Sequence, residues 1–329
     1  MPRIVCFSLN SCLDRTFSLH RILFDDINRV EAAQIDAGGK GNNVAVMAGK
    51  LGSDARVISL LGGQNGAVVG RMLRAEGIRV VTVRTREETR AIYNFVETAT
   101  GRMVRINEKG PAVSPAEQAT FFRVFARTPF SPGDFAVLSG SLPPGMRPDT
   151  YDLIIRNLNA RKVLTVLDAD NELFKRGIAA RPFLIKPNLW ELERAAGRRI
   201  RTSRQVMNTC RSFLDRGIGA LLLTLGGSGA VLFSREGIWR AWHPPVHTAC
   251  TVGCGDAFLA GFLHTTAKGE PPSACLAYAV ACGTAKACLP GTGMPDKKEV
   301  ERARKKIRTM TVRTPEEIPS PAEVSASEK

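Results

Sequence analysis

Apolar and polar positions follow two different periods along the first third of the chain. Runs rich in β-branched residues predict strands at 3–9, 56–61, 79–83, 91–97 and 103–106. The last three runs are close together in the sequence, which indicates a small antiparallel piece. Between the runs, apolar residues at helical spacing predict two helices, one around Val44 and one around Val69.

The alternation becomes regular beyond residue 110. It predicts helices at 116–126, 150–157, 190–196 and 205–216, and strands at 135–139, 163–167, 183–186 and 220–225. The last of these strands is apolar on both faces, as are parallel strands that helices cover on each side. This order predicts a doubly wound α/β sheet, in which ligands bind beyond the carboxyl ends of the strands.

Composition narrows the class of protein. The 329 residues are 44% hydrophobic, enough for a sizeable core, while the Pro-, Glu- and Ser-rich segment 310–329 predicts disorder. The eight cysteines form no C-x-x-C pair and there are only four histidines, so zinc-site spacing is missing. Scattered cysteines are typical of a reducing cytosol. With no signal peptide and no apolar run of about 18 residues, we expect a cytoplasmic protein without a membrane span.

The charge of the chain is strongly positive. A net charge of +15 and a pI of about 9.9 are compatible with nucleic acid, an anionic membrane or an anionic small substrate. Part of the excess lies in 297–308, which we interpret as a solvated basic helix face rather than a binding tail. No aromatic residues interleave with these charges, which argues against stacking on single strands. We therefore expect no nucleic-acid and no membrane partner.

Five glycine-rich or polar segments carry the candidate chemistry: 36–43, 138–145, 186–191, 224–229 and 251–256. Each segment also has a purely structural explanation that involves no ligand. These are, in order, a glycine-rich hairpin, a Pro/Gly turn, a capping box, a hairpin turn and an N-capped helix start at Asp256. Each also suits a ligand, because glycines let backbone N–H groups approach phosphates and helix starts attract anions. The spacing fits neither a P-loop nor G-x-G-x-x-G. Because the segments converge on one rim of the expected sheet, together they favour a binding site.

The segments Gly38-Gly-Lys-Gly-Asn-Asn43 and Val252-Gly-Cys-Gly-Asp256 resemble the two signatures of the PfkB (ribokinase-like) carbohydrate kinases. Segments 8–14, 106–111, 138–145, 186–188 and 290–296 are similar to the branch of 1-phosphofructokinase, tagatose-6-phosphate kinase and the minor 6-phosphofructokinase. The resemblance covers about residues 1–300. It implies a kinase domain over 1–309, with helices on both faces of a central, mostly parallel sheet. It also implies a small β-sheet lid from strands near 10–35 and 85–110, which pairs in a homodimer.

The resemblance also implies ATP and Mg²⁺ as cofactors and the transfer of the γ-phosphate to a sugar hydroxyl. Asp256 matches the catalytic base, and the anion hole matches Gly253, Cys254 and Gly255. Residues that match contacts to the sugar are Asp14, Gly39, Lys40, Asn43 and Ser139. A cationic cluster for the phosphate of the substrate matches Arg29, Arg90 and Arg105. The nucleotide region matches Lys186, Asn188, Glu191, Thr224, Gly226, Gly229, Ala279 and Gly283. Among these, Glu191 holds the magnesium ion through water.

Three positions depart from the family pattern. Cys254 replaces an alanine, and a thiol at a helix start predicts a lowered pKa and sensitivity to alkylation. Ser11-Cys12 replaces Pro-Ala in the sugar loop, and 168–171 replaces Asp-Thr-Ser-Gly.

The resemblance leads us to expect a kinase that converts fructose 1-phosphate to fructose 1,6-bisphosphate. Kinases for tagatose 6-phosphate or fructose 6-phosphate are the first alternative. A nucleoside or plain sugar kinase is the second, in which the three arginines would be ordinary exposed residues. A non-catalytic binding protein on a kinase fold is the third, against which the retained Asp256 argues.

Overall fold

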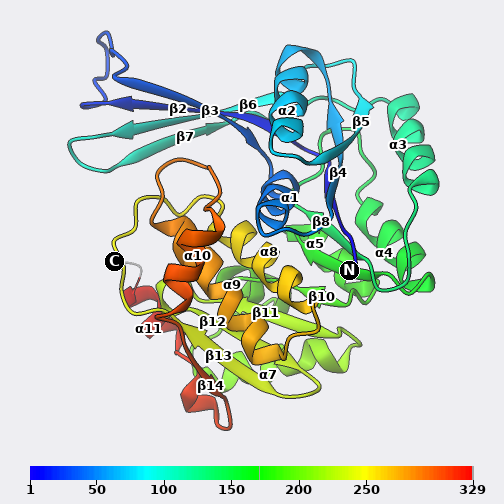
Figure 1. Ribbon diagram of the computed structural model, residues 1–329, viewed down its shortest axis with the longest axis vertical. Helices are drawn as coiled ribbons and strands as arrows, with labels where there is room; N and C mark the ends of the chain where they lie inside the picture. Colours follow the sequence, from blue (N-terminus) through cyan, green and yellow to red (C-terminus); the bar gives the residue numbers. More distant parts are fainter. Residues whose placement is uncertain (170, 328–329) are drawn as a thin grey trace.

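The computed structural model describes residues 1–169 and 171–327, and a large sheet organises them (Figure 1). From edge to edge its strands are β14 (Arg308–Thr311), β13 (Ile238–Trp242), β12 (Ala230–Ser234), β11 (Ala220–Thr224), β10 (Leu184–Ile185), β9 (Leu164–Asp168), β8 (Phe135–Ser139), β1 (Ile4–Ser8), β4 (Ala55–Leu61) and β5 (Arg79–Arg84). Pairing is parallel from β11 to β5 and antiparallel from β11 to β14. The expected α/β fold with a mostly parallel sheet is confirmed.

Helices cover both faces of this sheet. One face packs against α1 (Lys40–Lys50), α2 (Gly63–Ala75), α8 (Cys254–Thr266), α9 (Pro272–Ala287) and α10 (Lys297–Arg304). The other face packs against α3 (Pro115–Arg127), α4 (Thr150–Ala160), α5 (Asn171–Ala179), α6 (Leu189–Ala196) and α7 (Ser203–Asp215). Alternate residues of each central strand enter the two cores, as Val5 and Cys6 of β1 do. Among the helices described, none is long and apolar enough to cross a bilayer.

A second, four-stranded sheet projects from this body and is called the lid sheet below (Figure 1). Its order is β3 (Ala32–Gly38), β2 (Cys12–Leu19), β6 (Arg90–Glu97) and β7 (Met103–Asn107). The expectation of one antiparallel piece over 79–106 is wrong for its first strand. β5 pairs in parallel with β4 at the edge of the large sheet, because its apolar side chains continue the hydrophobic core between that sheet and its helices.

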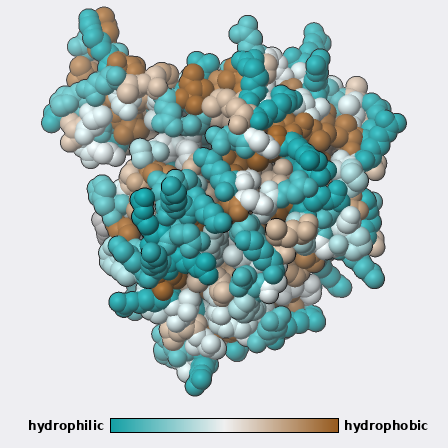
Figure 2. Space-filling view, in the orientation of Figure 1, coloured by the Kyte–Doolittle hydropathy of each residue, from teal (hydrophilic) through white to brown (hydrophobic). Residues whose placement is uncertain are grey.

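The two faces of the lid sheet differ in polarity. Side chains at alternate positions face the body and are mainly polar, including Asp14, Arg90 and Arg105. The opposite face, called the outer lid face, carries Phe17 stacked on Phe95 at 5.5 Å and, farther along, Ile35, Val104 and Ile106. Ile35, Val104 and Ile106 are 48%, 46% and 53% exposed. The projecting end of the sheet mixes such brown, hydrophobic side chains with hydrophilic ones (Figure 2).

The C-terminal segment differs from the expectation of disorder. It forms β14, a 3₁₀ turn at Pro315–Glu317 and helix α11 (Pro321–Ser327). Ile318 and Val324 are buried at 0% and 5% exposure because they complete the core on the α7 side of the sheet. The polar composition of the segment concealed these isolated apolar anchors. The domain boundary at 309 stays a prediction.

Close backbone contact joins α1 to the end of β1. The helix begins at Lys40, so the glycine-rich segment 36–43 is a strand-to-helix junction and not a hairpin. A Cβ on Gly41 would lie 2.6 Å from the carbonyl oxygen of Phe7, and a Cβ on Gly38 would lie 2.4 Å from the Asp14 carboxylate. Only glycine at these positions lets α1 start directly beside β1 and the lid sheet.

We predict that Gly41→Ala lowers the free energy of unfolding by about 1–3 kcal/mol, because the new methyl group meets rigid backbone and must displace α1. Urea denaturation measures the change. The matched control is Gly70→Ala in α2, where the nearest atom, at 3.2 Å, is the flexible end of Arg74. It should be neutral or stabilising by up to about 1 kcal/mol. Equal losses in both variants would contradict the argument.

Candidate active site

A large cleft of about 1960 Å³ lies between the carboxyl ends of the central strands and the lid sheet. Its lining takes residues from all five segments that the sequence singled out, represented by Gly39, Ser139, Asn188, Gly226 and Gly253. These segments are far apart in the sequence, but four of them follow strands of the large sheet at one edge, and 36–43 follows β3 of the lid sheet beside it. The prediction that they meet on one rim is confirmed.

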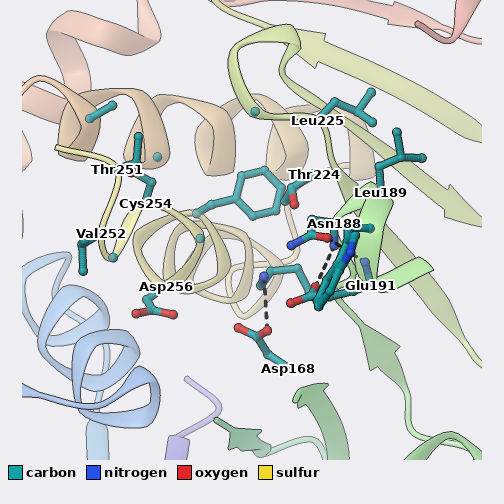
Figure 3. Close-up of a pocket in the computed structure, with 18 of the residues that line it drawn as sticks. Asp168, Asn188, Leu189, Glu191, Thr224, Leu225, Thr251, Val252, Cys254 and Asp256 are labelled. Carbon is teal, nitrogen blue, oxygen red and sulfur yellow. Dashed lines mark hydrogen bonds and ion pairs between the residues drawn. The ribbon is translucent and has the colours of Figure 1, made fainter. Parts of the chain in front are cut away.

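The N-terminus of α8 forms one wall of this cleft (Figure 3). Its N-cap, Gly253, has a φ of 81° and no side-chain cap. The N–H of Cys254 donates to the carbonyl of Thr251 at 3.3 Å. The N–H groups of Gly255 and Asp256 make no backbone hydrogen bond within the described chain, and they lie at the positive end of the helix dipole, beside the cleft. Asp256 is not the N-cap that the purely structural explanation required, because it is the third residue of the helix and its side chain bonds elsewhere.

Asp256 is the buried carboxylate at this helix start, with 6% exposure. Its Oδ2 accepts a hydrogen bond of 2.8 Å from Nδ2 of Asn43, in the first turn of α1. Burial and then the charge of Asp168 raise the pKa of Asp256 to about 6, although Lys40, Asn43 and Lys186 act in the opposite direction. A carboxylate with this pKa is suited to accept a proton near neutral pH.

Asp168, at the end of β9, is a member of the site that the sequence reasoning did not assign. Its Oδ1 lies 3.3 Å from Nζ of Lys40 and 3.3 Å from Nζ of Lys186, the second contact being drawn in Figure 3. Burial favours a higher pKa for Asp168, but the two ammonium groups outweigh it and hold the pKa below its usual value. The sequence contained a signal for Asp168, because it stands at the end of a strand, and the same position had already selected Ser139. Asp170, in the same departure from the family pattern, lies outside the described residues.

The lid sheet supplies the opposite wall through Asp14, Arg90 and Arg105. Burial raises the pKa of Asp14 above its usual value. Arg90 is held in place because its Nη2 and Nη1 donate to the carbonyls of Asn10 and Glu108 at 3.1 and 3.0 Å. Arg29 is not brought into the cleft, since it is exposed in the loop between β2 and β3.

Three buried polar atoms in the cleft have no hydrogen-bond partner within the described chain: Asn10 Oδ1, Ser139 Oγ and Asp168 Oδ2. Buried polar groups in folded proteins are nearly always paired, and exceptions call for an explanation. All three residues line the cleft, although Asn10 Oδ1 also lies against Gly110. Their arrangement fits a ligand that carries several hydroxyl or other polar groups.

Asn188 and Glu191 begin α6 as a reciprocal capping box. Asn188 Oδ1 accepts from the Glu191 N–H and Glu191 Oε2 accepts from the Asn188 N–H, each at 2.8 Å. The purely structural explanation of this pair is therefore confirmed. Both residues nevertheless line the cleft near Thr224 (Figure 3). Capping fixes the pair at the cleft wall and does not remove it from the site.

The segment after β11 is a hairpin turn that also lines the cleft. Gly226 and Gly229 have φ values of 53° and 90°, and a Cβ on Gly229 would collide with the carbonyl of Ala241. On α9, Gly283 lines the cleft, whereas Ala279 is fully buried behind it. Helix α11 contributes Pro321, Ala322 and Ser325 to the same end, which the expected disorder of this segment hid.

Cys254 contradicts the expectation of a lowered pKa. Its Sγ donates to the carbonyl of Cys250 at 3.5 Å, and burial raises the pKa of the thiol to about 11, although the charge of Lys286 acts in the opposite direction. Burial is the largest effect on the pKa of this thiol. The residue is therefore a neutral thiol at pH 7, so its environment does not favour alkylation.

Comparison with known proteins agrees with this geometry. The family model described as pfkB family carbohydrate kinase matches residues 1–299. A 1-phosphofructokinase of Rhodobacter capsulatus is 32% identical over 314 residues, covering 95% of this chain and 98% of the relative. Phosphofructokinase-2 from Escherichia coli, solved in complex with potassium, superposes with a TM-score of 0.88 at 25% identity over 93% of this chain and 99% of that one. Its tetrameric inhibited form superposes with a TM-score of 0.86 at 25% identity, with the same coverage. The chain thus belongs to the pfkB family of carbohydrate kinases, which are ATP-dependent phosphotransferases.

Proposed function

We propose that the protein transfers the γ-phosphoryl group of ATP to fructose 1-phosphate and forms fructose 1,6-bisphosphate. The observation that carries this proposal is the placement of Asp256 in one cleft between the uncapped start of α8 and the arginines of the lid sheet. The similarity to the 1-phosphofructokinase of Rhodobacter capsulatus supports fructose 1-phosphate over the other acceptors.

Asp256 acts as the general base in this proposal. Asn43 donates to Oδ2 and so directs Oδ1 towards the acceptor hydroxyl, whose proton it takes. The N–H groups of Gly253 and Gly255 stabilise the negative charge on the transferring phosphoryl group, and they are in position before the reaction begins. The N–H of Cys254, between them, already donates to the carbonyl of Thr251. Phosphoryl transfer depends mainly on such positioning and charge stabilisation.

The sugar phosphate binds between the lid sheet and Asp256. Asp14, Asn43 and Ser139 contact hydroxyl groups, with Gly39 and Lys40 beside them, as the unpartnered Ser139 Oγ supports. Arg90 and Arg105 bind the existing phosphate, because guanidinium groups suit a phosphate dianion. A kinase for an uncharged acceptor has no need of these two cations.

ATP with Mg²⁺ supplies the phosphoryl group and the positive charge that balances its phosphates. Lys186, Thr224, Gly226 and Gly229 are positioned to hold the nucleotide, with Gly283 on α9 and Ala279 behind it. In the described residues no group of three or more His, Cys, Asp or Glu side chains is arranged to hold a metal ion. This fits Mg²⁺, which uses one or two carboxylates and keeps its waters. Asp168 and Glu191 line the cleft and are suited to bind those waters.

The outer lid face supports a homodimer through the lid. Three apolar side chains there are about half exposed, and Arg29 is exposed in the loop between β2 and β3, outside the cleft of its own chain. Two lid sheets packed face to face would bury this apolar area and bring Arg29 near the cleft of the partner subunit. Related phosphofructokinase-2 is described as tetrameric in an inhibited form, which adds a further interface to be tested.

Activity is tested by coupled ADP release from ATP with fructose 1-phosphate, fructose 6-phosphate, tagatose 6-phosphate, fructose and adenosine as acceptors. We expect turnover with fructose 1-phosphate and a loss of about 10²–10⁴-fold in Asp256→Asn, because the base is removed while the Asn43 contact stays possible. The control Glu236→Gln removes an exposed carboxylate and should match the wild type. Turnover only with fructose or adenosine would refute the phosphate site, and no turnover in the wild type would favour a binding protein.

The pH profile tests the role of Asp256 independently. Its pKa of about 6 means that the carboxylate is the charged base above pH 6 and is protonated below it. We expect kcat/KM to fall tenfold per pH unit below about pH 6. Because the charge of Asp168 raises this pKa, Asp168→Asn should shift the falling limb to lower pH, whatever its effect on the maximum. A limb that stays at the same pH in Asp168→Asn would contradict the assignment.

Light scattering after size exclusion tests the dimer. Ile106→Glu places a charge on the outer lid face and should convert dimer to monomer and raise the KM for the sugar phosphate, because Arg29 of the partner subunit is lost. The control Val81→Glu charges a side chain of 38% exposure on β5, away from the lid, and should leave the dimer intact. A wild-type monomer would refute the proposal, and a tetramer that Ile106→Glu leaves unchanged would place the interface elsewhere.

A further inference from the structure

Lys286, in the last turns of α9, is a fully buried lysine that the proposed mechanism does not use. Its side chain is 0% exposed, and its Nζ donates a hydrogen bond of 2.8 Å to the carbonyl of Gly291. Across residues 1–169 and 171–327, no carboxylate lies within ion-pair distance of this ammonium, whereas the other buried lysine, Lys186, is paired with Asp168. Burying an unpaired charge is costly, so its presence requires an explanation.

The position of Lys286 behind the start of α8 explains why this charge is buried. Its Cε lies 3.6 Å from the point where a Cβ on Gly253 would be, directly behind the N-cap of α8. On the other side of the same turn, Nζ of Lys186 lies 3.4 Å from the corresponding point on Gly255. Two ammonium groups therefore flank residues 253–255, and only the charge of Lys186 is neutralised by a carboxylate.

The ammonium is also held in place from its far side. Gly291 packs against Gln34, and Oγ1 of the adjacent Thr292 donates to Oδ2 of Asp36 at 2.6 Å. Both Gln34 and Asp36 belong to β3 of the lid sheet. The loop that accepts the hydrogen bond of Lys286 is thus anchored to a second element, which limits the freedom of the charge to move away from α8.

We propose that Lys286 is a positioning residue that supplies a fixed positive charge behind the anion-hole turn. The charge acts through the backbone of residues 253–255 and stabilises the negative charge of the phosphoryl group in front of them. A preorganised charge in a buried site acts more strongly than the same charge in water, and here it adds to the dipole of α8. The inference rests on the proposed function, because it assumes that phosphate binds at this turn.

A purely structural role is the competing explanation, in which Lys286 only holds the Gly291 loop. Lys286→Met separates the two, because methionine keeps the length and apolar stem and removes the charge. A charge role predicts that kcat falls about 10- to 100-fold while the KM for the sugar phosphate stays within about threefold. It also predicts a Tm equal to or above that of the wild type, since a buried unpaired charge is gone. The control Lys298→Met removes an exposed lysine of α10 and should change neither quantity.

Cation rescue gives an independent readout. Lys286→Ala leaves a space for a small cation, so ammonium or methylammonium chloride should restore part of kcat, while tetramethylammonium, which is too large, should not. Full kcat in Lys286→Met, or a joint fall of kcat and Tm with no rescue of Lys286→Ala, would overturn the inference.

Binding of inorganic vanadate, followed by thermal shift, separates this inference from the proposed function. If the wild type has no turnover, the proposed function fails. Weaker vanadate binding in Lys286→Met than in the wild type would still support the charge behind the turn, and equal binding would overturn it.

Discussion

Two buried carboxylates in one cleft form the constraint on which the rest of the site depends. Asp168 and Asp256 lie close enough for the charge of one to raise the pKa of the other, and both are nearly excluded from water. Two such anions coexist only if cations and hydrogen bonds balance them. Lys40 and Lys186 hold Asp168 ionised, while Asn43 holds one oxygen of Asp256. The result is one carboxylate whose pKa is lowered and one whose pKa is raised to about 6, which suits the proposed base beside a phosphate site.

This balance explains why distant parts of the chain must meet with little tolerance. Lys40 and Asn43 come from the first turn of α1, Lys186 from the end of β10 and Asp256 from α8. The distances are possible only because α1 starts in contact with the backbone of β1, where a side chain on Gly41 would collide with Phe7. The glycine-rich segment thus has two functions: it lets the helix approach the sheet, and it places the lysine and the amide beside the acids.

The sequence predicted the large sheet better than the site. Apolar runs and helical periodicity located most strands and helices, because burial on two faces leaves a strong pattern. The pattern failed for β5 and for β14 with α11, where pairing with a distant strand or a few anchors such as Ile318 decides the structure. For the site, the strand-end rule found Ser139 and Asn188, and the resemblance supplied Asp256. Neither the rule nor the resemblance revealed the pairing of Asp168 with two lysines, because this pairing depends on distances across three elements. The lowered thiol pKa expected for Cys254 was wrong because burial is a tertiary property. For the same reason the sequence could not show that Arg29 lies outside the cleft of its own chain.

The division of charges between the two sheets separates the chemistry from the choice of acceptor. The lysines and Asp256 are carried by elements of the large sheet and its helices, which fix them relative to one another. Arg90 and Arg105, which line the cleft, lie on β6 and β7 of the lid sheet. A substitution there can move one of these cations without disturbing the balance around Asp168. In the proposed function, a change of acceptor would therefore require changes in the lid sheet, which sets the distance from the arginines to Asp256, and not in the elements that hold Asp168 and Asp256.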